Sequence, residues 1–452
     1  MMLDSLQIAE ASGGQHVADG PSGSLVTDTR KLRPGDWFLA LKGPNFDGNT
    51  MAGKARDAGC AGAVLERAPE GWDCGLVLVE DGLLALQDCA RWVREQFQGP
   101  VIGITGSSGK TTTRAMVADV LSQGFRVHQT AGNLNNHIGV PLTILSMGDV
   151  DEVLVLEMGM NAPGEIELLQ SIGRPTVRLI TNVSLAHAEG TGDLRSTAAC
   201  KEELFVNACA GDTLIVNVDD PMVVDMPRPS GCKVVTFGTR SDCDFVLQEV
   251  VIDSAALTTR MVAKTPLGCL DVEIPAPGHH IAIDALSAAA IGVCLGLGLP
   301  KIKDGLMAFE PVGMRMRIQE LSGGITLLND AYNANPASTL ASLETLASIQ
   351  GRRRIALLGD MLELGKFEAE SHREIVRAAL DSGIEVLGLV GPRFRQAAEA
   401  VPDATEIHLA DTAEAMGLLL TDRLGEGDVL LLKGSRGLAM ERVLHGLGLQ
   451  EA

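Results

Sequence analysis

The sequence predicts a three-domain α/β protein, and three observations lead to this fold class. A chain of 452 residues is too long for a single hydrophobic core. Short apolar runs rich in leucine and β-branched residues alternate with segments of helical composition along most of the chain. The spacing and polarity of these runs change near residues 98 and 311. We therefore expect domains at 1–98, 99–311 and 312–452.

The first block predicts a small N-terminal α/β domain. Its strand candidates are WFLAL, GAVLE and GLVLV, and residues 49–58 form one of the helical patterns between them. The central block predicts a mainly parallel, doubly wound sheet, because its apolar runs are continuous, as in strands covered on both faces. These runs are VIGIT, EVLVLEM, VRLITNV, DTLIVNV and KVVTF. The more polar stretch 238–276 predicts an inserted antiparallel section.

The last block restarts the alternation and predicts a C-terminal Rossmann-like domain with its own sheet. Its strand candidates are ITLLND, RRIALLG, EVLGLVG, TEIHLA and DVLLLKG. Ligands of open α/β sheets bind in the crevice at the carboxyl ends of the strands. The residues directly after the apolar runs are therefore the first candidates for a functional site.

Composition excludes several classes of protein. A formal net charge of -21 argues against binding to nucleic acid or to an anionic membrane surface, although a small anionic ligand needs only a few local donors. No apolar stretch is long enough to span a membrane, and the N-terminus lacks the features of a signal peptide. The nine cysteines are scattered without a C-x-x-C pair, as in a reduced protein. We expect a cytoplasmic monomer.

The strongest local motif runs from Gly103 to Thr112, GITGSSGKTT, between a predicted strand and a predicted helix. A glycine-rich turn at this place lets backbone N–H groups approach phosphate oxygens at the positive end of a helix. Lys110 would pair with the β- and γ-phosphates, and the Thr111 hydroxyl would bind Mg²⁺. The spacing departs from the common phosphate loop at Ile104, so a turn that binds nothing is the alternative. The candidate ATP-binding residues here are Thr105, Gly106, Ser107, Ser108, Gly109, Lys110, Thr111 and Thr112.

Two further residues are candidate metal ligands. Glu157 ends one central strand run, and His187 lies just beyond another, so both are expected at the same sheet edge as Thr111. Carboxylate and hydroxyl oxygens suit Mg²⁺, whereas imidazole is a less usual ligand for it. His187 alone is more simply an ordinary loop residue. Lys201, which two glutamates follow, is on composition alone more simply part of a solvated helix face.

The loop variant T-G-x-x-G-K-T-T resembles the ATP loop of the Mur ligases and the related folylpolyglutamate synthases. The resemblance implies an enzyme that phosphorylates a substrate carboxylate with ATP, after which an amine attacks the acyl phosphate. It also implies two Mg²⁺ ions, and a carbamylated lysine at Lys201 beside the second of them. The residues that it makes catalytic are Lys110, His187, Lys201 and Arg315, and the metal ligands are Thr111, Glu157, His187 and Lys201.

The same resemblance assigns substrate contacts. Residues 27–49 resemble the segment that binds uridine diphosphate, and residues 131–145 resemble the family's substrate loop. Without the resemblance, the first segment predicts a hairpin and the second an asparagine-rich turn. Asn49 replaces the family's usual histidine. The implied substrate-binding residues are Thr29, Arg30, Lys42, Gly43, Asp47, Gly48, Asn133, Asn136, Lys433 and Ser435.

Other segments are similar to one branch of the family, which adds D-alanyl-D-alanine to UDP-N-acetylmuramoyl-tripeptide in peptidoglycan precursor synthesis. These segments are NDAYNANPAS, LGDMLELG, EMGMNAPGEI and GMRMRI, and the match is collinear over nearly the whole chain. Arg315 would reach the γ-phosphate, Asp330 the ribose and Tyr332 the nucleotide. In the adenine segment, PGHHIAIDA, Ile281 and Asp284 stand where the family has asparagines; an ionised Asp284 only accepts hydrogen bonds.

Two alternatives remain at this stage. One is a ligase of the same fold that adds a single amino acid or glutamate. The other is a nucleotide-binding regulator without ligase chemistry, which would tolerate the loss of Glu157, His187 and Lys201.

Overall fold

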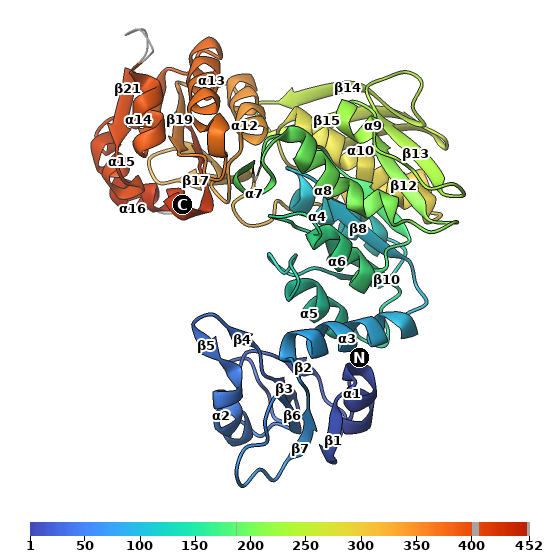
Figure 1. The fold of residues 1–452 in the computed structure, drawn as a ribbon. Coiled ribbons are helices and arrows are strands. Elements are labelled where there is room, and N and C mark those ends of the chain that lie inside the picture. The colour runs from blue at the N-terminus through green and yellow to red at the C-terminus, as the bar shows by residue number, and fades with distance from the viewer. Residues whose placement is uncertain (187, 400–405, 450–452) are drawn as a thin grey trace.

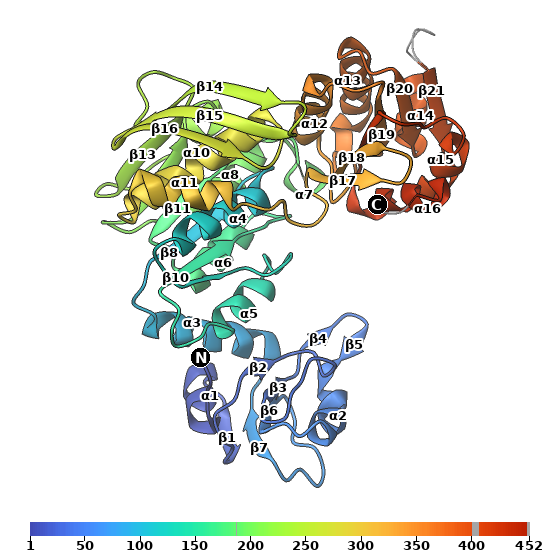
Figure 2. The same cartoon turned by 180° about the vertical axis from the view of Figure 1, so that it is seen from behind.

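The computed structural model describes residues 1–186, 188–399 and 406–449, and they form three α/β units in chain order (Figure 1). The predicted fold class is confirmed. The N-terminal and C-terminal units lie at opposite ends of the central unit, and Figure 2 shows the same arrangement from behind. Among the described helices, none combines the length and apolar character that a bilayer crossing requires.

The N-terminal unit contains a five-stranded sheet in the order β1-β7-β6-β3-β2, parallel except for β1, and a separate β4-β5 hairpin. The helical pattern expected at 49–58 becomes a short 3₁₀ turn followed by α2. The elements are α1 (Ser5–Ser12), β1 (Gln15–Ala18), β2 (Leu25–Val26), β3 (Trp37–Leu39), β4 (Lys42–Gly43), β5 (Phe46–Asp47), η1 (Gly48–Met51), α2 (Ala52–Asp57), β6 (Gly62–Leu65), β7 (Gly75–Leu78) and α3 (Gly82–Gln96).

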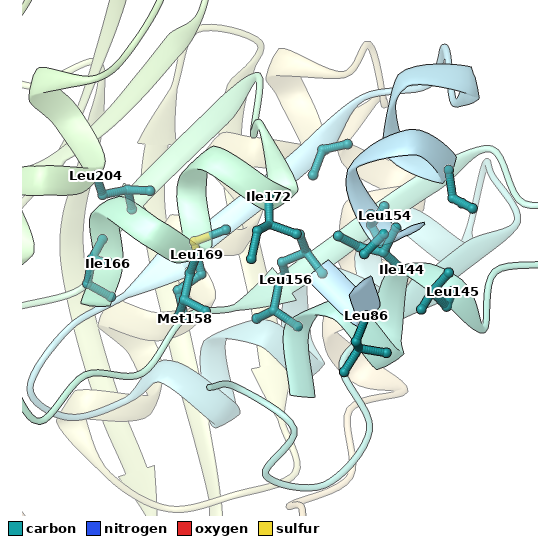
Figure 3. Close-up of a cluster of buried hydrophobic side chains, with 14 of the residues drawn as sticks. Leu86, Ile144, Leu145, Leu154, Leu156, Met158, Ile166, Leu169, Ile172 and Leu204 are labelled. Carbon is teal, nitrogen blue, oxygen red and sulfur yellow. The ribbon is translucent and has the colours of Figure 1, made fainter. Parts of the chain in front are cut away.

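Helix α3 connects this unit to the central one. Asp81 caps its first turn by accepting from two backbone N–H groups, and its apolar residues repeat at helical spacing. The helix packs against α1 on one side and against α5 and α6 on the other. Figure 3 shows Leu86 of α3 in one buried cluster with Ile144, Leu154 and Leu156. A continuous hydrophobic core therefore joins the two units.

The central unit has a nine-stranded sheet in the order β16-β15-β14-β13-β12-β11-β8-β10-β9. The strands from β14 to β9 pair in parallel, and β14, β15 and β16 pair antiparallel, as residues 238–276 predicted. The strands are β8 (Val101–Thr105), β9 (Val127–Gln129), β10 (Val153–Glu157), β11 (Val177–Ile180), β12 (Thr213–Asn217), β13 (Lys233–Gly238), β14 (Phe245–Asp253), β15 (Thr258–Thr265) and β16 (Gly268–Ile274). The helices are α4 (Lys110–Ser122), α5 (Gly139–Leu145), α6 (Glu165–Gly173), α7 (Ala188–Thr191), α8 (Leu194–Val206), α9 (Pro221–Val224), α10 (His279–Cys294) and α11 (Leu299–Met307).

Helices cover both faces of this sheet. Leu154 and Leu156 of β10 point into the cluster that α3, α5, α6 and α8 share. Val153 and Val155 point the other way, into a cluster with α4, α10 and α11. Because side chains alternate along a strand, a strand buried on both faces is apolar throughout. This is the reason that the central runs lack polar alternation.

The C-terminal unit has a six-stranded sheet in the order β17-β18-β22-β19-β20-β21, parallel except for β17. Separate clusters of buried side chains cover its two faces. Its elements are β17 (Arg317–Leu321), β18 (Ile325–Asp330), α12 (Pro336–Ser348), β19 (Arg354–Gly359), η2 (Gly365–Phe367), α13 (Glu368–Asp381), β20 (Val386–Val390), α14 (Pro392–Ala398), β21 (Glu406–Ala410), α15 (Ala413–Leu420), β22 (Val429–Lys433), η3 (Arg436–Leu438), η4 (Met440–Arg442) and α16 (Val443–Leu447).

Candidate active site

A pocket of about 540 Å³ lies between the central and C-terminal units, at the carboxyl ends of their strands. Its walls come from the phosphate loop, the asparagine-rich loop, the end of β10 and the start of α10 on one side. The residues after β18 and the start of α12 form the other side. Predicted site residues that line it are Ser107, Ser108, Gly109, Lys110, Thr111, Thr112, Asn133, Asn136, Glu157, Asp284, Arg315, Asp330, Tyr332 and Lys433.

The phosphate loop joins the end of β8 to the start of α4, as the motif predicted. Gly109 ends the loop with φ +78°, a left-handed conformation that favours glycine. A Cβ atom at this position would lie 2.8 Å from Asp284 Oδ1, so the close approach of α10 also requires glycine. The N-terminal end of α4 therefore faces the pocket with its free N–H groups.

The segment after β11 holds this loop in place. Ser107 Oγ donates to Ser184 O at 2.9 Å and accepts from Ser184 N at 2.8 Å. Asn182 Oδ1 accepts from Ser108 N at 3.0 Å. Thr105, at the end of β8, donates its hydroxyl to Met158 O at 2.7 Å instead of lining the pocket. Sequence reasoning missed Asn182 and Ser184, which lie at the end of the run VRLITNV and directly after it, because neither belongs to a recognisable functional motif.

Lys110 turns back over the loop, where its Nζ donates to Gly106 O at 2.7 Å. Burial lowers the pKa of the Lys110 amine; the nearby Glu157 carboxylate opposes this shift and the Arg315 guanidinium adds to it. Two cations from different units therefore face the same pocket. Such a site favours an anionic ligand that neutralises both.

Glu157, the last residue of β10, is 2% exposed and lines the pocket with Thr111. Its Oε1 accepts from Asn135 Nδ2 at 2.8 Å. Its Oε2 lies 3.4 Å from Arg114 Nε, but within the described part of the chain neither atom has a hydrogen-bond partner, because the two are poorly aligned. A buried carboxylate oxygen without a donor, in the same pocket as a threonine, fits a Mg²⁺ ion that keeps water or phosphate oxygens as its other ligands.

Two candidate metal ligands remain, His187 and Lys201. His187 lies outside the described residues. Within the described residues, no group of three or more His, Cys, Asp or Glu side chains is arranged to hold a metal. Lys201, on α8, is only 1% exposed, so it is not part of a solvated helix face. Burial lowers the pKa of its amine well below the ordinary value, and the Lys110 charge acts in the same direction.

The C-terminal side of the pocket contains two linked pairs. The Arg315 guanidinium lies over the Tyr332 ring, with Cζ 3.7 Å from the ring centroid. Asp330 Oδ2 pairs with Lys433 Nζ at 2.5 Å and also accepts from Ser342 Oγ at 2.7 Å. The sequence assigned Asp330 to the nucleotide and Lys433 to the substrate, and the structure makes them direct partners.

Two titratable residues of α10 line the same pocket. Asp284 Oδ1 accepts from Thr113 Oγ1 at 3.0 Å, which places the carboxyl group beside the phosphate loop. Burial raises the pKa of Asp284 to about 7, and the Thr113 hydrogen bond opposes the shift. Burial also lowers the pKa of His280 to about 4, so this imidazole is neutral at physiological pH.

In the asparagine-rich loop, the asparagine that contacts Glu157 is not one of the two that the sequence singled out. Asn133 and Asn136 line the pocket as expected, but Asn136 Oδ1 also accepts from Ile138 N at 3.1 Å and Gly139 N at 2.8 Å, at the start of α5. Asn135, which the sequence did not single out, contacts Glu157. Ser435 is buried outside the pocket, where its Oγ accepts from Leu362 N at 2.8 Å.

The predicted uridine-diphosphate residues lie in the N-terminal unit and do not line this pocket. Arg30 pairs with Asp28 at 2.8 Å in the turn that contains Thr29. Lys42 and Gly43 form β4, opposite Asp47 and Phe46 of β5. Asp47 in addition accepts from Asn49 Nδ2 at 2.8 Å, and Gly48 begins the following turn.

A phosphate loop, an acidic strand end and a facing arginine between two α/β units define a nucleotide-dependent phosphoryl-transfer enzyme. Comparison with known proteins specifies the class further. A model described as the Mur ligase middle domain matches residues 104–292, and one described as the Mur ligase, glutamate ligase domain, matches residues 314–436. UDP-N-acetylmuramoyl-tripeptide–D-alanyl-D-alanine ligase of Escherichia coli (strain K12) is 38% identical over 96% of this chain and 96% of its own length. The enzyme of that name from Bacillus subtilis (strain 168) is 34% identical over 94% and 92%, respectively.

Solved structures show the same relationship. MurF from Acinetobacter baumannii has a TM-score of 0.90 at 28% identity, with 99% of each chain covered. MurF ligase from Thermotoga maritima, in complex with ADP, has a TM-score of 0.83 at 28% identity over 94% of this chain and 97% of that one. The chain therefore belongs to the Mur ligase family. The predicted resemblance and the predicted ligase class are both confirmed.

Proposed function

We propose that this chain joins D-alanyl-D-alanine to the terminal carboxylate of UDP-N-acetylmuramoyl-tripeptide, at the expense of ATP, in peptidoglycan precursor synthesis. One observation carries the mechanism: the phosphate loop, Glu157 and Arg315 line a single pocket although they come from two separately folded units. The full-length relatives that bear this activity in their names support the choice of substrates.

The proposed reaction has two bond-forming steps. A carboxylate oxygen of the tripeptide attacks the γ-phosphorus, the bond to the β-phosphate oxygen breaks, and ADP leaves. The neutral dipeptide amine then attacks the acyl carbon, the carbon–oxygen bond breaks, phosphate leaves with that oxygen, and the nitrogen releases one proton to solvent. Lys110 would stabilise the transferring phosphoryl group and then the oxyanion at the acyl carbon, while the Arg315 guanidinium neutralises the γ-phosphate from the opposite wall.

Metal binding is part of the proposal. Thr111 and Glu157 would hold one Mg²⁺, and His187 with a carbamylated Lys201 would hold a second. Bound Mg²⁺ would neutralise two anionic reactants that otherwise repel each other in a cleft of low dielectric. The burial of Lys201 supports the modification, because its lowered pKa favours the neutral amine that can add to CO₂. The carbamate would then be an anion facing the Lys110 cation.

We assign one substrate to each unit. Residues 1–98 would bind the uridine diphosphate group, through the β4-β5 hairpin and the turn at Thr29 and Arg30. Residues 99–311 would bind the ATP phosphates, and residues 312–452 the dipeptide and the rest of the nucleotide. Asp330 and Tyr332 would contact the nucleotide. We further propose a monomer in the cytoplasm, where ATP and nucleotide-linked precursors are available.

A panel of acceptors tests the proposed substrates. Purified protein with MgATP would be given UDP-N-acetylmuramoyl-tripeptide together with D-alanyl-D-alanine, D-alanine, L-alanine or glutamate, and phosphate release would be measured. We expect release that requires both the tripeptide and the dipeptide. Equal turnover with a single amino acid would assign the chain to another branch of the family. ATP binding without acceptor-dependent release would instead favour a regulator.

A further inference from the structure

Among the contacts between the described parts of the C-terminal and central units are two hydrogen bonds near the pocket. Glu189 N, on α7, donates to Glu363 O at 3.0 Å in the loop before η2. Asn335 Nδ2, before α12, donates to Ser107 O of the phosphate loop at 3.4 Å. In Figure 1, α7 and α12 lie where the two units meet, and α12 also packs against α10. The second of these hydrogen bonds reaches the phosphate loop itself.

The orientation of the Asn335 amide is fixed by its role as a helix cap. Asn335 has extended backbone angles, and its Oδ1 accepts from Ser338 N at 2.8 Å. Its own N–H donates to Ser338 Oγ at 3.1 Å, which completes a capping box. With Oδ1 committed to the cap, Nδ2 is left pointing out of α12 toward the loop. The capped start of α12, in the C-terminal unit, therefore presents the Asn335 Nδ2 donor to the central unit.

The acceptor of that donor belongs to a peptide unit held from two sides. The carbonyl of Ser107 takes the Asn335 amide, and the N–H of the same peptide, on Ser108, donates to Asn182 Oδ1 at 3.0 Å. The C=O and N–H of a trans peptide point in opposite directions. One asparagine from each unit therefore contacts the peptide plane between Ser107 and Ser108, so Asn335 adds a restraint from the C-terminal unit to a loop that the central unit already holds.

We propose that Asn335 is a positioning residue that couples the C-terminal unit to the phosphate loop, so that nucleotide affinity depends on where that unit sits. The inference rests on the proposed ATP-dependent activity. When the C-terminal unit is in the position seen here, the Ser107 peptide is held in one orientation. When that unit moves away, the Ser107 carbonyl loses the Asn335 donor, and the contacts from Thr181, Asn182 and Ser184 of the central unit remain. Nucleotide that fits the held loop therefore favours the docked unit, and the coupling is reciprocal.

The chain offers a variant that separates this role from helix capping. Asn335→Ser keeps a good N-cap, because the serine hydroxyl can accept from Ser338 N, but its side chain is too short to reach Ser107 O and adds no charge. Thr339→Val is the matched control. Thr339 is buried on the first turn of the same helix and donates to Asn335 O at 2.8 Å, so its loss perturbs α12 without removing the donor to the loop.

The experiment measures ADP affinity by calorimetry, KM for ATP and the melting temperature of full-length protein. For Asn335→Ser we expect the affinity for ADP to fall, and the KM for ATP to rise, by about three- to tenfold, which is the range of one neutral hydrogen bond. The melting temperature should be nearly unchanged. For Thr339→Val we expect a lower melting temperature with unchanged ADP affinity and KM. Wild-type affinity in Asn335→Ser, or equal weakening in both variants, would overturn the inference while the proposed function stands. If the wild type neither bound ADP nor released phosphate, the proposed function itself would be wrong.

Discussion

The side-chain amide of Asn135 donates to Glu157 Oε1 at 2.8 Å, whereas Glu157 Oε2 has no hydrogen-bond donor among the described residues, in a pocket that Thr111 also lines. Asn135 therefore orients the carboxylate from a different loop. Arg114, at 3.4 Å on the other side, lowers the energy of the buried charge without forming an aligned hydrogen bond. With Asn135 and Arg114 in these positions, Oε2 of Glu157 is available to a cation in the pocket.

We predict that Asn135→Ala weakens magnesium binding. Residues that orient a metal ligand typically contribute 10- to 100-fold to metal affinity, so the Mg²⁺ concentration for half-maximal phosphate release should rise by about that factor. Asn207→Ala is a suitable control, because its amide donates to Glu203 O on α8, away from the pocket. An unchanged Mg²⁺ dependence in Asn135→Ala would contradict the assigned role of Glu157.

We predict that the effects of replacing Asp330 and Lys433 on the free energy of unfolding are strongly non-additive. Lys433 is 2% exposed, so Asp330→Ala leaves a buried ammonium without its carboxylate, at a cost of about 3 kcal/mol. The double variant with Lys433→Met removes both charges and should recover more than half of that loss. Chemical unfolding of both single variants and the double variant gives the coupling energy. Additive losses would mean that the two charges do not stabilise each other.

Asp284 should make stability depend on pH. Its pKa rises from an ordinary 3.8 to about 7 in the folded chain, so the folded state keeps a proton that the unfolded state has lost between these values. Folding stability therefore falls as pH rises through this window, and Asp284→Asn removes the fall. Relative to the wild type, the variant should gain on the order of 2 to 4 kcal/mol between pH 4 and pH 8.

Urea unfolding of both proteins at several pH values measures this difference. Asp284→Asn also removes a negative charge next to the phosphate loop, so its KM for ATP should fall below that of the wild type above pH 7 and equal it at pH 5. A stability difference that does not change with pH would show that the carboxyl group of Asp284 titrates normally.

We predict that Lys201→Met and Lys201→Arg both lose most of their activity but differ in stability. Neither side chain can form a carbamate, so phosphate release should fall by on the order of 100-fold in each. Because the pKa of Lys201 is lower in the folded chain, the unfolded chain binds a proton on this amine at pH values where the folded chain does not. The unmodified lysine therefore destabilises the fold most at low pH and less as pH rises. In bicarbonate-free buffer, Lys201→Met should melt above the wild type and Lys201→Arg below it. Full activity in Lys201→Met would remove the carbamate from the mechanism.

Sequence patterns predicted the strands and the phosphate loop well because those features are local. A strand buried on both faces is apolar throughout, and β8 and β10 show this directly. The partners of Glu157 were not predictable in the same way. Asn133, Asn135 and Asn136 have the same chemistry, and only the path of the loop decides which amide meets the carboxylate. Arg114 resembles an ordinary polar helix residue but is 4% exposed.

Contacts between segments far apart in the chain could not be predicted from the sequence either. Asp330 and Lys433 are 103 residues apart and become neighbours because β18 and β22 pair in a register that places them opposite each other. Similarly, α3 precedes the expected boundary at residue 98, yet it packs against both units, which composition does not reveal. Strand register and helix packing are set by the whole fold, so such pairs appear only in the structure.

The central claim is that the pocket transfers a phosphoryl group to a substrate carboxylate, and an isotope measurement tests it most directly. The terminal carboxylate of UDP-N-acetylmuramoyl-tripeptide would be labelled with ¹⁸O, and the phosphate released in the presence of MgATP and D-alanyl-D-alanine would be analysed by mass spectrometry. The acyl-phosphate route predicts that each released phosphate carries one oxygen from the labelled carboxylate. Phosphate without the label would contradict it, because its new oxygen would then have come from water.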